Sequence, residues 1–275
     1  MNENTDQRAW TRRQQIFRAR FGPWAVVTGA SDGIGREFSL RLAETGLNLV
    51  LVARRGEVLA ALADELKERH AISTLVVASD LAKPSGVDEV MGRIEDLNVG
   101  LLVAAAGFGT SGPFIDSMLG GELEMIDLNC RAVAALSHHF GRRFAQQRRG
   151  GIVLMSSLVA FQGVPRAANY AATKAYVQSL AEGLRIELAP FGVEVLSSAP
   201  GPVLSGFAKR ADMKMSMALT PKSVAQATLN ALGRRGTVRP GWLSILLEAS
   251  LAFLPRWGRV RMMGVVMGGM TKHRG

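Results

Sequence analysis

The stretch WAVVTGASDGIGREFSLRLAE, residues 24–44, decides the fold. Its first five residues form an apolar run of strand length, and residues 33–44 carry Phe38 and Leu42 at the four-residue spacing of an amphipathic helix. Between them, TGASDGIG (28–35) contains three glycines, Gly29, Gly33 and Gly35. A strand, a glycine-rich turn and a helix in this order predict a βα unit whose helix N-terminus approaches a pyrophosphate. Such glycines also occur in turns that bind no ligand, so the prediction of a pyrophosphate site depends on the strand and the helix on either side.

Further apolar runs follow along the chain, and helical patterns separate them. They span residues 47–53, 73–79, 100–106, 151–157 and 193–199. Continuous apolar strands that alternate with helices are typical of a parallel sheet covered on both faces. We therefore expect an α/β fold: a single-domain, Rossmann-type, doubly wound parallel sheet with helices on both faces.

The composition divides the 275 residues into three parts. We expect a basic N-terminal extension over residues 1–22, the Rossmann-type catalytic domain over 23–241, and an apolar and basic C-terminal extension over 242–275. Neither an internal repeat nor a Pro/Ser-rich linker interrupts the central part, which favours one domain.

The net charge of +10 lies at the two ends of the chain. Five arginines oppose two acidic residues in 1–22, and eight basic residues oppose Glu248 alone in 234–275. The body between them is formally neutral and does not interleave aromatic with basic residues, which argues against a nucleic-acid partner.

The C-terminal extension begins with an apolar stretch, residues 242–254, that contains Glu248 and is shorter than the ~20 residues of a membrane span. Arg256, Arg259 and Arg261 follow it. The combination indicates peripheral membrane contact, with a subunit contact or a cover over the substrate as the alternatives. The arginine-rich N-terminus lacks the apolar run of a secretory signal, so we expect a cytoplasmic protein.

Cysteine and histidine usage excludes two further kinds of site. The single cysteine, Cys130, cannot form an internal disulfide and fits a reducing compartment. Two of the four histidines, His138 and His139, are adjacent and cannot face one metal ion from a helix. We expect no metal site.

The end of the second apolar run indicates which dinucleotide binds. NAD-binding folds place an acidic residue about 20 positions past the glycines, to hold the ribose 2′-hydroxyl. Arg54 and Arg55 stand there instead, and two guanidiniums suit a 2′-phosphate. A solvated basic helix start is the alternative, and Asp32 adds an opposing negative charge nearby. The pattern favours NADP(H) over NAD(H).

A candidate acid–base pair lies in YAATK, residues 170–174. Tyr170 and Lys174 are four residues apart in a helical pattern, so they lie on one face. A phenol has a pKa of about 10, and a neighbouring ammonium lowers that pKa toward the range of a general acid/base. Ser157 ends the preceding strand, where its hydroxyl can lie beside the phenol and polarise a carbonyl oxygen.

With these motifs in order, the chain resembles a short-chain dehydrogenase/reductase. The similarity runs from about residue 24 to 205. Its motifs are TGASDGIG (28–35), Asp80-Leu81, AAAG (104–107), Asn129, Ser157, YAATK (170–174) and PGPV (200–203). The combination is specific, although several of the motifs are weak alone.

The resemblance implies a tetrad of Asn129, Ser157, Tyr170 and Lys174. In it, Tyr170 exchanges a proton with the substrate and Ser157 positions the carbonyl oxygen. Lys174 lowers the pKa of the tyrosine and binds the nicotinamide ribose, while Asn129 holds a water in the proton relay. The full cofactor-binding set becomes Gly29, Ser31, Asp32, Gly33, Ile34, Gly35, Arg54, Arg55, Asp80, Leu81, Ala106, Gly107, Tyr170, Lys174, Pro200, Gly201, Val203 and Ser205.

Two positions depart from the family pattern. Ala105 stands where the family usually has an asparagine that braces neighbouring strands, and Ser205 stands where it usually has threonine. Serine keeps the hydroxyl for the carboxamide, and neither change removes the tetrad.

The sequence is most similar to the branch that contains 17β-hydroxysteroid dehydrogenases and long-chain 3-ketoacyl reductases. That similarity implies an NADP(H)-dependent oxidoreductase for a hydrophobic carbonyl or alcohol, and a homodimer or homotetramer. A non-catalytic NADP(H)-binding regulator is the alternative. The intact Ser157, Tyr170 and Lys174 set favours the enzyme, because a binding module does not need it.

Overall fold

The computed structural model describes residues 11–204, 218–241 and 254–270, and the structural statements below concern these residues. Ser205 and most of the first half of the C-terminal extension lie outside them.

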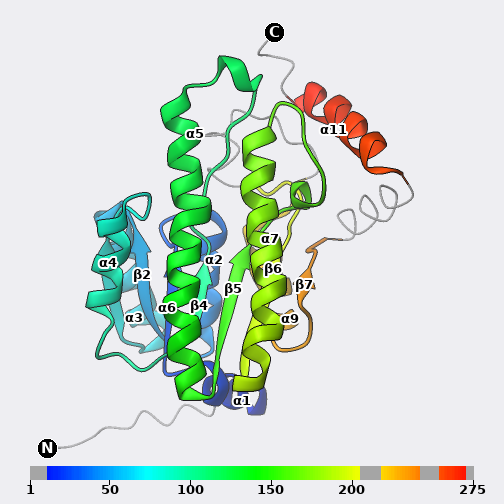
Figure 1. Ribbon diagram of the computed structural model, residues 1–275. Helices are drawn as coiled ribbons and strands as arrows, with labels where there is room; N and C mark the ends of the chain where they lie inside the picture. The colour runs from blue at the N-terminus through cyan, green and yellow to red at the C-terminus, as the bar shows by residue number, and fades with distance from the viewer. Residues whose placement is uncertain (1–10, 205–217, 242–253, 271–275) are drawn as a thin grey trace, which may run out of the picture.

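Within these residues the chain folds around one seven-stranded parallel sheet (Figure 1). The strands are β1 (Trp24–Thr28), β2 (Asn48–Ala53), β3 (Thr74–Ala78), β4 (Val99–Ala104), β5 (Gly150–Met155), β6 (Val193–Ser198) and β7 (Thr237–Val238). Their order across the sheet is β3-β2-β1-β4-β5-β6-β7. This order confirms the expected Rossmann-type, doubly wound architecture.

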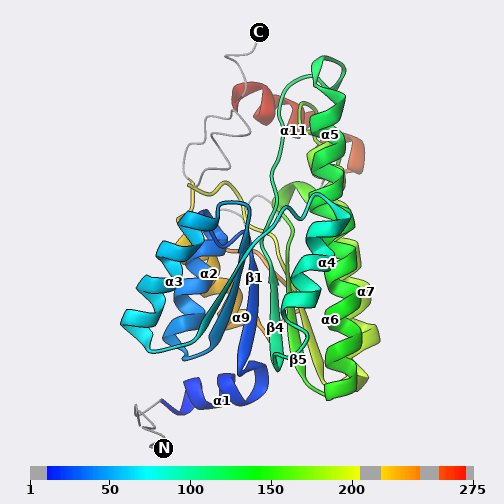
Figure 2. The same cartoon turned by 90° about the vertical axis from the view of Figure 1, so that its left-hand side faces the viewer.

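Helices cover both faces of the sheet (Figure 2). They are α1 (Arg12–Phe21), α2 (Gly33–Glu44), α3 (Gly56–His70), α4 (Pro84–Arg93), α5 (Leu119–Ile126), α6 (Ala132–Gln147), α7 (Ala168–Leu188), α9 (Pro221–Ala231) and α11 (Arg256–Met270). On one face the core joins α2, α3 and α9, and on the other it joins α4, α6 and α7.

The strands supply both cores by alternation. In β1, Ala25 and Val27 belong to the core under α2, whereas Val26 belongs to the core under α6. Successive side chains of a strand point to opposite faces, so a strand buried on both faces is apolar throughout. This explains why the strand sequences are continuous apolar runs.

The strand order changes direction between β1 and β4, which are neighbours in the sheet. The connections from β1 and β4 leave toward opposite halves of the sheet, and the carboxyl ends of these two strands flank a crevice. Ligands of doubly wound folds bind at such a switch point.

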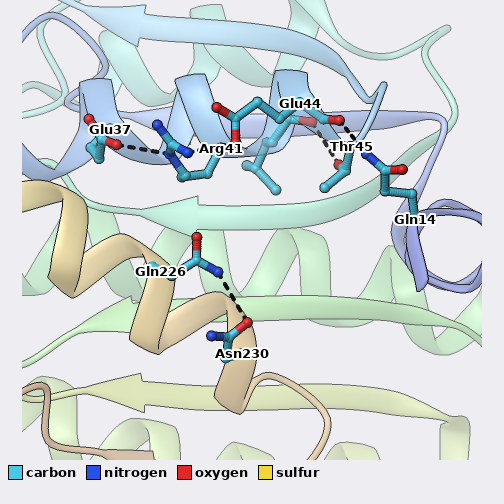
Figure 3. Close-up of polar contacts among 8 residues, drawn as sticks. Gln14, Glu37, Arg41, Glu44, Thr45, Gln226 and Asn230 are labelled. Atoms are coloured by element: carbon cyan, nitrogen blue, oxygen red, sulfur yellow. Dashed lines mark hydrogen bonds and ion pairs between the residues drawn. The ribbon is translucent and has the colours of Figure 1, made fainter. Parts of the chain in front are cut away.

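The described part of the basic N-terminal extension contains α1, which packs against the domain at the amino end of the strands (Figure 2). Phe21 is buried in the core, and Gln14 Nε2 donates to the Glu44 carbonyl of α2 at 2.9 Å (Figure 3). Arg149 Nη1 also donates to the Gly22 carbonyl at 2.6 Å. Phe21, at the end of α1, thus gives this basic segment a contact with the core. The net charge of the segment does not predict such a contact.

The helical segment between β4 and β5 is interrupted. A π-helical turn, Asp127–Arg131, separates α5 from α6 and buries Asn129. π-turns insert a residue into a helix and occur often at functional sites.

Candidate active site

A cavity of about 870 Å³ opens at the carboxyl ends of β1, β2, β4 and β5. It extends from the glycine-rich turn, past Tyr170, to α11. Sequence-predicted residues that line it are Gly29, Ser31, Asp32, Gly33, Ile34, Gly35, Arg54, Arg55, Asp80, Leu81, Ala106, Gly107, Ser157, Tyr170, Lys174, Pro200, Gly201 and Val203. One cavity therefore brings together residues that span more than 170 positions of the chain.

The three glycines of the glycine-rich turn stand at positions that disfavour a side chain. Gly29 and Gly33 have φ angles of +68° and +52°, a region that side chains disfavour. A Cβ atom on Gly35 would lie 2.2 Å from the Gly29 carbonyl oxygen. Asp32 was expected to oppose a phosphate, but its Oδ1 accepts the Gly33 N–H at 2.7 Å and caps α2. The bare backbone and the N-terminus of α2 fit a pyrophosphate.

The two arginines after β2 have different partners. Arg55 Nη2 donates to the carbonyl and the hydroxyl of Ser31, at 3.1 and 3.0 Å, which ties it to the glycine-rich turn. Arg54 Nη1 lies 3.5 Å from Glu124 Oε1 of α5, and both side chains are about half exposed. Exposed ion pairs contribute little to stability, so Arg54 is able to exchange this partner for a ligand phosphate.

The end of β4 is braced without the asparagine that the family usually has. The Ala106 N–H donates to Thr28 Oγ1 of β1 at 3.0 Å, beside Ala105. A Cβ atom on Gly107 would lie 2.9 Å from Asn129 Oδ1 and 3.5 Å from Lys174 Nζ. Gly107 thus allows the backbone to approach both side chains.

Tyr170 and Lys174 project from the first turns of α7 toward the end of β5. The Tyr170 side chain is half-buried, and its hydroxyl is hydrogen-bonded to the Ser157 side chain. Lys174 Nζ donates to the Met155 carbonyl at 2.8 Å and lies 5.8 Å from the centre of the Tyr170 ring. Ser156 Oγ donates to the Lys174 carbonyl at 3.0 Å and fixes α7 against β5. A proton donor, a hydroxyl and an ammonium thus meet in one wall of the cavity.

Burial shifts the pKa values of both Tyr170 and Lys174. Burial raises the pKa of Tyr170 to about 12, and the hydrogen bond to Ser157 offsets part of that rise. Burial also lowers the pKa of Lys174 to about 8, while its attraction to Cys130 acts in the opposite direction. Burial is the largest cause of both shifts, and the lowering of the Tyr170 pKa by the charge of Lys174 stays a prediction.

Asn129 lies behind the cavity wall. Its Oδ1 accepts the Phe108 N–H at 3.2 Å, and its Nδ2 donates to the Phe108 carbonyl at 2.8 Å and to Thr173 Oγ1 at 3.1 Å. These bonds join the π-turn to the segment after β4 and to α7. Asn129 thereby connects both segments that flank Lys174.

Sequence reasoning did not assign α11 to the site. Its residues Arg259, Met263, Val266 and Met267 line the same cavity as the glycine-rich turn and Tyr170. A cover over the substrate was one of three alternatives for the C-terminal extension. The spacing of these four residues at i, i+4, i+7 and i+8 is the sequence signal for one helical face.

The chain is similar to known proteins over most of its length. The family model described as short chain dehydrogenase matches residues 23–216. A 7β-hydroxysteroid dehydrogenase of Collinsella aerofaciens is 29% identical over 238 residues, 82% of this chain and 88% of the relative. A very-long-chain 3-oxoacyl-CoA reductase of Ajellomyces capsulatus is 34% identical over 224 residues, 78% of this chain and 66% of the relative.

Solved structures lead to the same family. A short-chain dehydrogenase from Sphingobium yanoikuyae in complex with NADPH superposes with a TM-score of 0.77 at 29% identity, covering 86% of this chain and 97% of that one. The family match, the sheet order and the residues gathered in the cavity agree. The chain belongs to the short-chain dehydrogenase family, oxidoreductases that act on alcohol and ketone groups with a nicotinamide cofactor.

Proposed function

We propose that this protein interconverts a hydrophobic ketone and its alcohol, with NADP(H) as the cofactor and Tyr170 as the proton donor and acceptor. The observation that carries the proposal is the Tyr170–Ser157 hydrogen bond in the cavity that also holds the glycine cradle and Arg54. A proton donor next to a dinucleotide cradle is what carbonyl reduction requires.

In this mechanism the nicotinamide, when bound, supplies the hydride to the carbonyl carbon. Ser157 donates a hydrogen bond to the carbonyl oxygen and orients it beside the Tyr170 hydroxyl. Tyr170 then transfers its proton to that oxygen, and the positive charge of Lys174 stabilises the phenolate that remains. Because the pKa of Tyr170 is raised to about 12, the phenol is protonated at neutral pH, as an acid in reduction must be.

The choice of NADP(H) rests on Arg54 and Arg55, and the NADPH complex of the Sphingobium relative supports it. We expect the wild-type protein to bind NADPH at least tenfold more tightly than NADH. The double variant Arg54→Ala/Arg55→Ala is expected to lose roughly a hundredfold in NADPH affinity, because each charge-assisted hydrogen bond contributes about 1.5–3 kcal/mol. Fluorescence titration with both nucleotides measures these affinities.

The matched control is Arg36→Ala. Arg36 pairs with Glu65 between α2 and α3 and does not line the cavity. This variant should keep the NADPH preference. Equal affinity of the wild type for the two nucleotides would reject the 2′-phosphate assignment but keep the enzyme, whereas binding of neither would reject the cofactor itself.

The substrate end of the cavity supports a hydrophobic ligand. It is lined by apolar side chains that include Phe108, Val159, Phe161 and Met263. The named relatives act on a hydroxysteroid and on very-long-chain 3-oxoacyl-CoA. A bulky or extended apolar ketone fits the apolar lining of the cavity and is of the same kind as the substrates in the names of these relatives.

We also propose that the chain forms a homo-oligomer through α5 and α7. Leu123 and Ile126 of α5 and Tyr176 and Ile186 of α7 are exposed apolar side chains on these neighbouring helices. Burial of such residues in a subunit contact removes apolar area from water.

We propose peripheral membrane contact through the outer face of α11. Among the described residues, no helix is long and apolar enough to cross a membrane. Trp257 and Val265 are 65% and 79% exposed, and the exposed Arg261 lies over the Trp257 ring at 5.3 Å. Trp257, Arg261 and Val265 recur every four residues, so one helical face offers apolar and basic groups to an anionic surface.

We expect the full-length protein to sediment with phosphatidylglycerol vesicles but not with phosphatidylcholine vesicles. Trp257→Ser/Val265→Ser should reduce the bound fraction at least fivefold, because these side chains supply the apolar contact. Val58→Ser, at an exposed position of α3, is the matched control. Equal sedimentation of the two variants would exclude this face. Truncation of the extension is unsuitable, since the inner face of α11 also lines the cavity.

A further inference from the structure

Gln162 is a buried amide in the wall of the cavity. The residue is 6% exposed and lines the cavity together with the apolar side chains of Val159 and Phe161. It directly follows a short 3₁₀ helix, η3 (Leu158–Phe161), whose N-cap is Ser157. With the ~2 Å rise of a 3₁₀ helix, the backbones of Ser157 and Gln162 are on the order of 10 Å apart. The amide therefore belongs to the same loop as the hydroxyl that orients the carbonyl in the proposed mechanism.

The loop that carries Gln162 is fixed on two sides. The Leu158 N–H donates to the Pro200 carbonyl at 3.1 Å, which ties the start of η3 to the segment after β6. At the other end of the loop, a Cβ atom on Gly163 would lie 3.5 Å from Val260 of α11. Gln162 thus has a defined place between the strand ends and α11, as a residue that selects among substrates requires.

The hydrogen bond of the amide nitrogen shows how the Gln162 side chain is oriented. Its Nε2 donates to the Leu158 carbonyl at 3.3 Å. A carbonyl accepts but cannot donate, so the nitrogen of the amide, and not its oxygen, must face Leu158. Within the described part of the chain, Gln162 Oε1 accepts no hydrogen bond, and it is not sealed from solvent. Since Gln162 lines the cavity, Oε1 is an acceptor that a ligand can reach.

We propose that Gln162 determines substrate specificity by accepting a hydrogen bond from a hydroxyl group of the substrate, away from the carbonyl that Ser157 and Tyr170 hold. A ligand that fills the cavity removes water from Oε1, and a buried acceptor without a donor is unfavourable. A hydroxyl group supplies this donor without bringing a charge among the apolar side chains of the lining. An ether or a second ketone at the same place can only accept, so it cannot replace the hydroxyl.

The substrate class is therefore a hydrophobic hydroxyketone, and the product of its reduction is a diol. This inference rests on the proposed function, because it assigns a second polar contact of the same ligand.

Matched ketosteroids test this contact. They carry at carbon 3 a hydroxyl, a methoxy group or no substituent, and the ketone is at carbon 7 in one set and at carbon 17 in the other. We expect the wild-type enzyme with NADPH to favour the hydroxyl member of one set over its deoxy member at least tenfold in kcat/KM. The deoxy member leaves Oε1 unpaired, and a site built to bind a hydroxyl discriminates against such an analogue. The methoxy member should be reduced no faster than the deoxy member.

Gln162→Met keeps the length of the side chain and removes the amide. It is expected to lower kcat/KM for the hydroxyl member at least tenfold and to change that of the deoxy member less than twofold. The Kd for NADPH should stay the same. Gln226→Met is the matched control, because it removes an amide from an exposed position of α9 outside the cavity, and it should keep the preference for the hydroxyl. Thermal unfolding of each variant shows whether the fold is retained.

Two results would overturn the contact. They are a wild-type enzyme that does not prefer the hydroxyl member in either set, and a Gln162→Met enzyme that loses the same factor on hydroxyl and deoxy members. The second result would mean that the amide only supports the loop, through its bond to Leu158.

The deoxy members test the proposed function separately, because their reduction does not depend on Gln162. If no ketone is reduced, calorimetric titration of the hydroxyl and deoxy members into the wild type and Gln162→Met, both with NADPH, still decides the contact. Tighter binding of the hydroxyl member to the wild type alone would support it, and equal binding would overturn it.

Discussion

Tyr170→Phe is expected to lower kcat for ketone reduction about a thousandfold while the Kd for NADPH changes less than twofold. The phenol is the proposed proton donor and is hydrogen-bonded to Ser157, and a positioned acid contributes about 10²- to 10⁴-fold to rate. Phenylalanine keeps the ring and the volume, so α7 keeps its place. Single-turnover kinetics with a bulky apolar ketone such as a keto-steroid measure the loss, and fluorescence titration measures the affinity.

The chain supplies its own control for this experiment. Its only other tyrosine, Tyr176, lies on the same helix and is 42% exposed. Tyr176→Phe should leave kcat unchanged. A Tyr170→Phe enzyme that retained a tenth or more of the wild-type kcat would show that another group donates the proton.

The strands and helices of the sheet could be predicted closely because the sequence signals for them are local. The expected strand and helix over residues 24–28 and 33–44 coincide with β1 and α2. Apolar runs end where glycine or a polar cluster forces a turn, and the amphipathic period of α2 depends on neighbours in sequence. The gathering of the glycine turn, Arg54 and Tyr170 in one cavity also follows, since carboxyl ends of parallel strands share an edge.

What the sequence did not predict depends on contacts between distant segments. The burial of Phe21 against the sheet and the inner face of α11 involve partners more than 70 residues away. The π-turn around Asn129 is equally hidden, because its residues continue the helical pattern. The raised pKa of Tyr170 and the lowered pKa of Lys174 could not be predicted for the same reason: burial is set by the whole fold, whereas the four-residue spacing shows only that the two are neighbours.

Lys174→Met is expected to inactivate the enzyme and to stabilise its fold. Loss of the charge that stabilises the Tyr170 phenolate should lower kcat by a hundredfold or more. A pKa of about 8, against the usual 10.5, means that burial disfavours the ammonium form by about 3 kcal/mol at pH 7. The lost hydrogen bond to the Met155 carbonyl offsets about 1–1.5 kcal/mol of this. Calorimetry at pH 7 should therefore record a Tm higher by about 4 °C.

The pH dependence distinguishes this explanation from a general packing gain. The pKa of Lys174 is lower in the folded than in the unfolded state, so between pH 8 and 10.5 the unfolded chain binds more protons. The wild type therefore gains stability across this window, whereas the methionine variant lacks that contribution. The difference in Tm should be largest at pH 7 and should shrink by pH 9.5, and Lys222→Met, at an exposed position of α9, should show neither effect. A Lys174→Met protein with a lower Tm, or with the same advantage at both pH values, would mean that the ammonium is not held at the cost of stability. A loss of stability of this kind is expected where a fold buries a lysine whose positive charge the reaction needs.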